Sequence, residues 1–485
     1  MTETTDAMSE RTAHRAITFG LLIGTRGFFN PAHAATARKD LLKKLDDLGY
    51  NYLIPSEKAT PTGAVETLRD AKVYAEFFRS HRDEIDGLIV VLPNFGDEQG
   101  IAETLSRAKL DVPVLVQACN DEVDKVSVSQ RRDAYCGKIS VTNNLYQYGI
   151  PWTDTIEHTC DITDEVFSQD LDRFSRVCRV VKGLTNARIG AIGARPAPFN
   201  TVRFSEKLLQ ATGITVVPVD LSEMIAAAEK IGTDTPEVKA KLDEVRSYGS
   251  IPNEIVEANI LKQVRLSVAI DHWMEENECD ASAIQCWSSI QNNYGCATCL
   301  SMSMMGEKLM PSACEVDITG VVSMYALALA GGSPPGFLDW NNNYGREADK
   351  VVCTHCSNYP KSFMGSEIEI SNLDILGETL GRERCFGAIK GKVAPGPFTF
   401  FRMSTDDRMG MIRSYLGQGE FTNDPFPMDG GIAVCKIPGM RDMMRYITRE
   451  GFEHHVAMAR GHFAPVLEEA IDTYLDWELY VHEGD

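Results

Sequence analysis

The chain has 485 residues, of which 44% are hydrophobic, 24% charged and 8% aromatic. This composition is ordinary for a globular protein and excludes the disordered and fibrous classes. Because 48 Lys and Arg stand against 69 Asp and Glu, the formal net charge is −21, which argues against nucleic acid and anionic membranes as partners, since both need a basic surface. At roughly 100 to 200 residues per domain, the length predicts a multidomain protein.

The N-terminal residues give no targeting signal. Residues 1–15 are polar with mixed charges, and the apolar run 17–23 is too short for a secretory signal with a cleavage site. The longest apolar stretch, 321–330, falls far short of the roughly 20 residues of a membrane helix. The 13 cysteines in such a chain favour reduced thiols over a disulfide framework. We therefore expect a soluble, cytoplasmic protein.

From residue 17 onward, short aliphatic runs alternate with amphipathic segments of helical period, which is typical of parallel sheets covered by helices. The expected strands are 17–23, 88–92, 112–116, 189–192, 214–217 and 282–286. The expected helices include 34–48, 64–79, 99–108, 204–212 and 256–276. Two doubly wound α/β units fit this alternation better than one.

Three domains are expected. The aperiodic, acidic stretch 153–172 favours a first α/β domain at 1–172 and a second, with the metal ligands discussed below, at 173–355. After residue 383 short runs broken by Gly and Pro indicate antiparallel strands. This predicts a mainly antiparallel β domain at 356–485, closed by a helix over 463–480.

Common catalytic motifs are absent from the sequence. There is no phosphate-binding Gly-x-x-x-x-Gly-Lys-Ser/Thr loop, no Gly-x-Gly-x-x-Gly after the first strand and no Gly-x-Ser-x-Gly. Two Cys-x-x-Cys pairs, Cys296/Cys299 and Cys353/Cys356, raise the alternative of a four-thiolate zinc site. Their separation is much longer than the roughly 15 to 20 residues of a zinc ribbon, so we favour buried core cysteines.

Two carboxylates stand out between residues 311 and 356. Asp317 begins an apolar helix and is expected to be its N-cap, whereas Glu315, just before it, has no such structural role. A buried Glu would be costly there unless paired or bound to a metal. Asp339 follows Phe337 and Leu338 and precedes a polar turn, so we place it at the carboxyl end of a strand, where α/β sheets bind ligands. A surface Glu and a turn-capping Asp are the plain alternatives.

Histidines complete the set. His355 ends the predicted strand 351–354, and His454 and His455 lie further along the chain, where at most one of the two adjacent side chains is expected to be a ligand. Each alone would more often be a core or surface histidine. Carboxylates with imidazole and without thiolate suit octahedral Mn²⁺ or Mg²⁺ better than tetrahedral zinc.

At these residues the sequence resembles the L-fucose isomerase and L-arabinose isomerase superfamily of metal-dependent aldose–ketose isomerases. The superfamily's Ala-Thr-Glu-Asn-Asp motif corresponds to residues 313–317, with Cys314 and Val316 in place of Thr and Asn, and Gly320 follows. The Phe-x-Asp motif corresponds to 337–339, 24 positions after the Glu. The order of two α/β units and a Gly/Pro-rich β domain also matches.

The resemblance implies the site and the chemistry. Glu315 and Asp339 would be both metal ligands and the catalytic acid/base pair, with Glu315 as the main base. His455, and as in the arabinose branch His355, would be further ligands of Mn²⁺, or of Mg²⁺ or Co²⁺. The reaction would move a proton between C1 and C2 of a monosaccharide through a cis-enediol, and the protein would be a homotrimer or homohexamer.

Candidate substrate-binding residues are Arg26, after the first strand, Gln285 and Trp287, at the end of a later strand, and Arg195 and Arg203, in a loop that suits an anionic substituent. A plain surface Arg or core Trp is the alternative for each. Two other functions stay open: an isomerase of a sulfonated or phosphorylated sugar on the same scaffold, and a non-catalytic sugar-binding protein.

Overall fold

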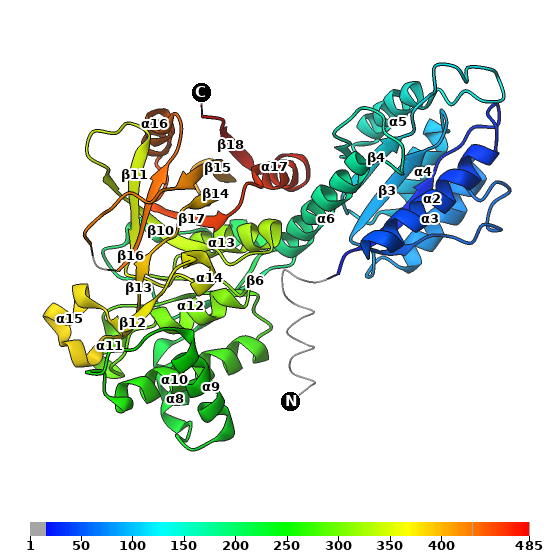
Figure 1. Ribbon diagram of the computed structural model, residues 1–485. Helices are drawn as coiled ribbons and strands as arrows, with labels where there is room; N and C mark the ends of the chain where they lie inside the picture. The colour runs from blue at the N-terminus through cyan, green and yellow to red at the C-terminus, as the bar shows by residue number, and fades with distance from the viewer. Residues whose placement is uncertain (1–15, 429, 485) are drawn as a thin grey trace. The chain divides into compact units, whose positions relative to one another are not determined.

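The computed structural model describes residues 16–428 and 430–484 (Figure 1). The described residues form two compact units, the smaller made of 16–182 with Glu469–Asp476 and the larger of Gly183–Glu468 with 477–484. None of the described helices is long and apolar enough to cross a membrane.

The smaller unit is a parallel five-stranded sheet of order β2-β1-β3-β4-β5 with helices packed on it. Its strands are β1 (Thr18–Ile23), β2 (Asn51–Leu53), β3 (Gly87–Leu92), β4 (Val114–Ala118) and β5 (Thr153–Asp154). Its helices are α2 (Ala32–Leu48), α3 (Leu68–Ser80), α4 (Glu98–Ala108), α5 (Ala134–Tyr148) and α6 (Glu165–Thr185), the last of which continues into the larger unit. Strand β3 is buried along its whole length because helices cover both faces of the sheet.

The C-terminal part of the chain returns to this unit. The hydroxyl of Tyr474 lies 2.8 Å from Thr153 Oγ1 and donates to the carbonyl of Val114 at 3.3 Å. These bonds attach residues 469–476 to β4 and β5, so the unit is built from two separate parts of the chain.

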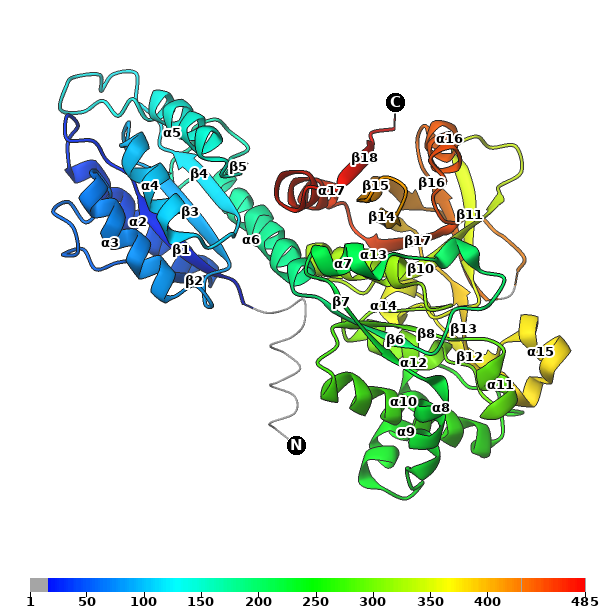
Figure 2. The ribbon, with the colours of Figure 1, turned by 180° about the vertical axis from the view of Figure 1, so that it is seen from behind.

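The larger unit begins with a second parallel sheet, of order β7-β6-β8-β9. Its strands are β6 (Arg188–Ile192), β7 (Thr215–Val219), β8 (Ala281–Ile284) and β9 (Ser312–Ala313), and its helical segments are η1 (Asn200–Val202), α7 (Glu206–Ala211), α8 (Leu221–Lys230), α9 (Pro236–Tyr248), α10 (Glu257–Glu276), α11 (Ser289–Asn293) and α12 (Cys299–Glu307). Helices α8 and α10 pack on β6 and β8 through one shared apolar core (Figure 2).

A nine-stranded, mostly antiparallel sheet forms the rest of the unit, in the order β12-β13-β16-β11-β10-β17-β14-β15-β18. Its strands are β10 (Gly336–Asn343), β11 (Lys350–His355), β12 (Glu369–Asn372), β13 (Phe386–Lys392), β14 (Gly396–Asp406), β15 (Met411–Phe421), β16 (Gly431–Lys436), β17 (His455–Arg460) and β18 (Glu478–His482). A further β15–β16 pairing joins the two ends of the run β16-β11-β10-β17-β14-β15, which closes these strands into a barrel. The remaining helical segments of this unit are α13 (Ile318–Gly331), α14 (Lys361–Met364), α15 (Asp374–Leu380), η2 (Arg382–Arg384), α16 (Met440–Glu450) and α17 (Ala464–Glu468). The π-helical η3 (Glu469–Leu475) follows α17 and belongs to the smaller unit.

Helix α13 connects the parallel sheet to the barrel. It packs against β14 and β17 on the barrel side and against β8 and β9 on the other, so every residue from Ile318 to Ala330 is buried (Figure 1). A helix enclosed in this way must be apolar all round, which explains its sequence. Its N-terminus therefore lies inside the protein, beside the residues that follow β9.

The fold class is confirmed: two parallel α/β sheets precede an antiparallel β domain with a C-terminal helix. Four details differ from the sequence-based expectation. Residue 172 lies within α6, because 165–185 is helical where the sequence looked aperiodic. Strands β10 and β11 belong to the antiparallel sheet and not to the second parallel sheet. Asp339 lies in the middle of β10 and not at its end. The closing helix ends at Leu475, and β18 follows it. The two expected boundaries between the three domains stay a prediction.

Candidate active site

A cavity of about 570 Å³ opens in the larger unit beside the start of α13. Polar, acidic, basic and apolar side chains line it. The lining residues are Phe199, Trp287, Glu315, Asp339, Asn341, Thr354, His355, Cys356, Leu373, Asp374, Ile375, Leu376, Lys390, Met428, Gly430, His454 and His455. Glu315 and Asp339, the two carboxylates singled out from the sequence, are therefore in the same cavity.

Glu315 is positioned by a strained turn between β9 and α13. Both Glu315 and Val316 have φ of +56°, in the left-handed region that residues with side chains rarely adopt. Such conformations cost about 1 to 3 kcal/mol each and concentrate at functional sites. The turn buries the Glu315 side chain at the carboxyl edge of the parallel sheet, the edge at which this class of sheet binds ligands.

The two oxygens of Glu315 have different surroundings. Oε1 accepts hydrogen bonds from the indole of Trp287 at 3.0 Å and from the thiol of Cys286 at 3.3 Å. Oε2 is buried without a hydrogen-bond partner among the described residues, and lies 3.5 Å from Nε2 of His455 and 3.7 Å from Nε2 of His355. Burial acts to raise the pKa of Glu315, but the neighbouring imidazole of His355 outweighs it and lowers that pKa below its usual value.

Strand pairing brings the second carboxylate to the same histidine. Asp339 on β10 lies directly opposite His455 on β17, and such cross-strand pairs have side chains on the same face. Oδ1 of Asp339 is also buried without a hydrogen-bond partner among the described residues, and lies 3.4 Å from Nε2 of His455. The free oxygens of both carboxylates thus approach one imidazole nitrogen.

A buried ionic network orients that imidazole. Nδ1 of His455 lies 2.8 Å from Oδ2 of Asp317. The guanidinium of Arg402 donates to both oxygens of Asp317, at 2.8 and 3.2 Å, and to Glu453 at 3.2 Å. Burial acts to raise the pKa of Asp317, but Arg402 and His455 outweigh it and hold that pKa well below its usual value. Asp317 is therefore an anion that leaves Nε2 of His455 facing the cavity.

Asp317 is also the predicted N-cap. Its Oδ1 accepts from the backbone N–H of Gly320 at 2.8 Å, which confirms this expectation. The sequence did not predict the contact between Asp317 and His455, nor the roles of Arg402 and Glu453. Nothing local in the sequence connects Asp317 with its partners, because Arg402 lies on β14, His455 begins β17 and Glu453 lies in the loop just before β17.

The donors fit a divalent cation. Two buried carboxylate oxygens that accept no hydrogen bond from the described residues converge with one imidazole nitrogen, and donors of this kind suit a Mn²⁺ or Mg²⁺ class ion. Donors at right angles around such an ion stand about 3 Å apart, so separations of 3.4 and 3.5 Å require only a small contraction.

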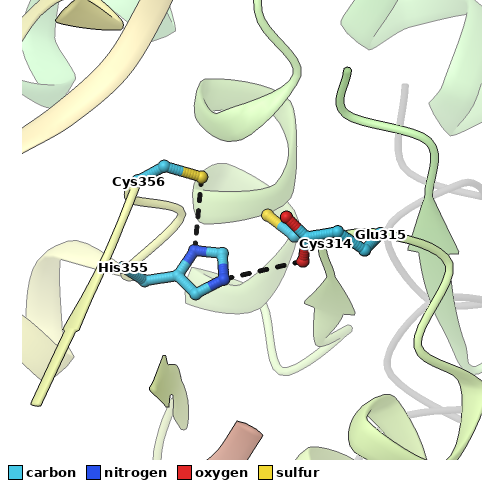
Figure 3. A group of neighbouring side chains, drawn as sticks. All are labelled: Cys314, Glu315, His355 and Cys356. Carbon is cyan, nitrogen blue, oxygen red and sulfur yellow. Dashed lines mark hydrogen bonds and ion pairs between the residues drawn. The ribbon is translucent and has the colours of Figure 1, made fainter. Parts of the chain in front are cut away.

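The other histidines lie at the edge of this arrangement. Nε2 of His454 lies 3.7 Å from Asp339 Oδ1, and its side chain is partly exposed, so both members of the pair border the cavity. Nδ1 of His355 lies 3.4 Å from the Cys356 thiol, and its ring stands between Cys356 and Glu315 (Figure 3). The role of His355 as a ligand stays a prediction.

The predicted substrate-binding residues are scattered. Trp287 lines the cavity, as expected. Gln285 lies outside it and accepts from the backbone N–H of Ala194 at 2.9 Å. Arg195 donates to carbonyls of its own loop. Arg26 belongs to the smaller unit, where it pairs with Glu98 at 3.3 Å and stacks on Phe95. Their roles in substrate binding stay predictions.

Lys390 on β13 was not singled out from the sequence. It lines the cavity and forms an ion pair with Asp374, at the start of α15. Among the described residues it is the only lysine or arginine of the cavity wall. A single Lys among other charged residues gives no sequence signal.

Comparison with known proteins agrees with this fold. Residues 20–185 match the family described as fucose/sulfoquinovose isomerase, N-terminal domain, and residues 353–482 match the L-fucose isomerase, C-terminal domain. A sulfoquinovose isomerase of Priestia aryabhattai is 25% identical over 383 residues, which cover 78% of this chain and 82% of that protein. One of Alkalicoccus urumqiensis is 26% identical over 394 residues, covering 79% and 83%. The chain therefore belongs to the L-fucose isomerase superfamily and is an aldose–ketose isomerase.

Proposed function

We propose that this protein isomerises a sulfonated aldose of the sulfoquinovose class to the corresponding ketose, with a divalent cation held by Glu315, Asp339 and His455. The observation that carries the site is the convergence on Nε2 of His455, inside a cavity, of two buried carboxylate oxygens that accept no hydrogen bond from the described residues. The substrate class rests on the relatives, which are named sulfoquinovose isomerases.

Mn²⁺ is the proposed ion, with Mg²⁺ and Co²⁺ as alternatives. A cation bound there would supply Lewis-acid polarisation of the sugar oxygens at C1 and C2. The carboxylate–imidazole donor set supports this choice, since a zinc site would normally recruit more nitrogen or sulfur. Asp317 and Arg402 would keep His455 in the tautomer that presents Nε2.

The chain's own residues then handle the protons. Isomerisation moves one proton between C1 and C2 and another between O1 and O2. We assign the carbon-bound proton to Glu315 and the hydroxyl proton to Asp339, with the enediol between them. The donors on Oε1 of Glu315, Trp287 and Cys286, would hold this carboxylate in place for the transfer. Such acid–base catalysis contributes about 10² to 10⁴ in rate.

Lys390 is the candidate partner of the sulfonate. An anionic substituent buried in a cavity needs a cation or several donors, and Lys390 is the lysine that the described wall provides. Its partner Asp374 lines the same cavity, so substrate binding would exchange one anion for another. A neutral aldose would leave this pair intact, which gives a physical basis for choosing the charged sugar.

The test is an assay of the Mn²⁺-loaded protein on sulfoquinovose and on neutral aldoses, with ketose formation followed by NMR. We expect turnover of the sulfonated sugar and loss of about 10² to 10⁴ in kcat for Glu315→Gln. Glu257→Gln, at an exposed ion pair on α10, is the control and should keep full activity. Turnover of neutral sugars alone would contradict the substrate class, and near wild-type activity of Glu315→Gln would contradict the mechanism.

The remaining expectations belong to this proposal. We infer that the enzyme acts in the cytoplasm and assembles as a homotrimer or homohexamer, as the superfamily resemblance implies. Several large apolar side chains are exposed on the described surface, including Phe28, Val123 and Ile375. Their exposure is consistent with subunit interfaces. Sedimentation analysis of the purified protein would test the oligomeric state.

A further inference from the structure

Sulfur donors gather beside Glu315. Cys314 and Glu315 follow β9, while His355 is the last residue of β11 and Cys356 comes directly after it, and Figure 3 shows the four side chains facing one another. One donor atom of each lies within 4.8 Å of those of the other three. Cys314, Glu315 and His355 are buried, and Cys356 is partly exposed to the cavity. We call these four residues the thiol cluster.

The two cysteines of each Cys-x-x-Cys pair have different surroundings. The thiol of Cys299 interacts with Cys314 and Cys356, whereas Cys353 interacts with Cys435 on β16. Cys296 has Cys385 as its neighbouring thiol. Cys356 therefore lines the cavity, and Cys299 lies behind it as a buried neighbour of Cys314 and Cys356. Cys296 and Cys353 are core residues with other thiols beside them. This arrangement could not be inferred from spacing, because Cys314 belongs to neither pair.

We propose that the thiol cluster binds a thiophilic divalent ion of the zinc class through Cys314 Sγ, Cys356 Sγ, one imidazole nitrogen of His355 and Oε2 of Glu315. Zn²⁺ prefers four such donors in a tetrahedron. If four donors stood 4.8 Å apart at the corners of a tetrahedron, its centre would lie about 2.9 Å from each, and zinc needs about 2.0 to 2.3 Å. Side-chain movements below about 1 Å complete the coordination.

The surroundings of the cluster favour metal binding over plain core packing. Core cysteines need no imidazole or carboxylate among them, yet here Cys356 Sγ lies 3.4 Å from Nδ1 of His355. Oε2 of Glu315 is buried and has no hydrogen-bond partner among the described residues. A bound ion would satisfy this oxygen, and the two thiols would release their protons on binding.

The zinc-class site shares Oε2 of Glu315 with the site proposed for Mn²⁺. Occupancy of the thiol cluster therefore withdraws the base from Asp339 and His455 and stops isomerisation. Thiolate donors raise the affinity for Zn²⁺ far above that for Mn²⁺, so zinc acts as a tight inhibitor that Mn²⁺ does not readily displace. This consequence rests on the proposed function, whereas the binding itself does not.

The direct test is titration of the metal-free, reduced, full-length protein with Cd²⁺, whose thiolate complexes absorb in the near ultraviolet. We expect a band that saturates at one equivalent and is abolished by Zn²⁺. Cys314→Ala and Cys356→Ala should each weaken Cd²⁺ binding by more than about 100-fold, since each removes a direct ligand. Cys296→Ala and Cys353→Ala are matched buried controls and should keep the band. Unchanged Cd²⁺ affinity in Cys314→Ala or in Cys356→Ala, or loss of the band in both controls, overturns the assignment.

Two further measurements keep the proposal testable if a variant does not fold. In the unmodified protein, Cd²⁺ should protect Cys356 from alkylation while the exposed Cys136 reacts as before; reaction of Cys356 at an unchanged rate contradicts the site. Asp339→Asn should lose Mn²⁺ binding and keep the cadmium band, which separates failure of this inference from failure of the proposed function. A Cys314–Cys356 disulfide in the protein as purified from cells would also overturn the proposal that the thiol cluster binds metal.

Discussion

The replacement Asp317→Asn tests the ionic network behind His455. Asn is as good an N-cap as Asp, so the bond to the N–H of Gly320 can persist through the amide oxygen. The amide nitrogen, however, cannot accept the protons of Arg402 or His455. The variant therefore removes the charge of Asp317 and leaves its capping role.

The contacts of Asp317 set the size of the expected loss of stability and of metal affinity. Breaking a fully buried ion pair costs about 3 to 5 kcal/mol. Arg402 keeps its bond to Glu453 at 3.2 Å and to Thr319 at 2.9 Å, so the lower end applies and we expect a loss of about 3 kcal/mol in the free energy of unfolding. Loss of the partner of a histidine ligand lowers metal affinity by about 10- to 100-fold. Both effects should appear together.

Urea unfolding of the metal-free protein measures the stability, and calorimetric titration with Mn²⁺ measures the affinity. Asp97→Asn is the control, because Asp97 caps α4 with a bond of 2.7 Å to Gly100 and has no ion pair among the described residues. It should change neither quantity. A folded Asp317→Asn protein that binds Mn²⁺ as tightly as the wild type would refute the orienting role of Asp317.

Three further outcomes are expected. Mn²⁺ at 100 times its Kd should raise the free energy of unfolding by about 2.7 kcal/mol, and a chelator should reverse this gain. Asp339→Asn should abolish the gain. An equal gain in that variant would show that the ion binds elsewhere. Lys390→Gln should lower kcat/KM for sulfoquinovose about tenfold or more, because a charge-assisted hydrogen bond contributes about 1.5 to 3 kcal/mol. An equal loss of kcat/KM on a neutral sugar would show that Lys390 does not bind the sulfonate. Trp287→Phe removes the indole donor to Oε1 of Glu315 and should lower kcat about tenfold with little change in KM; an unchanged kcat in steady-state assays would exclude its role in positioning Glu315.

The sequence predicted much of the fold because its signals are local. Aliphatic runs located most strands of the parallel sheets, and the step from Glu315 to the apolar helix located a carboxylate at a buried helix start. Asp317 was recognised as a cap for the same reason. The barrel was less accessible: β10 pairs with β17, more than 100 residues later in the chain, and no local pattern encodes that register.

The same limit applies to the site. Asp339 was found from its approach through Phe337 and Leu338, but its position opposite His455 results from strand pairing. Arg402 and Glu453 are charged residues in ordinary surroundings of the sequence, and only the fold buries them beside Asp317. Residues whose role depends on a partner far along the chain could not be identified from spacing.

The most direct measurement of the central claim is an anomalous difference map from crystals of the protein loaded with Mn²⁺. We predict one strong peak within about 2.0 to 2.4 Å of Glu315 Oε2, Asp339 Oδ1 and His455 Nε2. A peak coordinated by other side chains, with these three donors left free, would contradict the account.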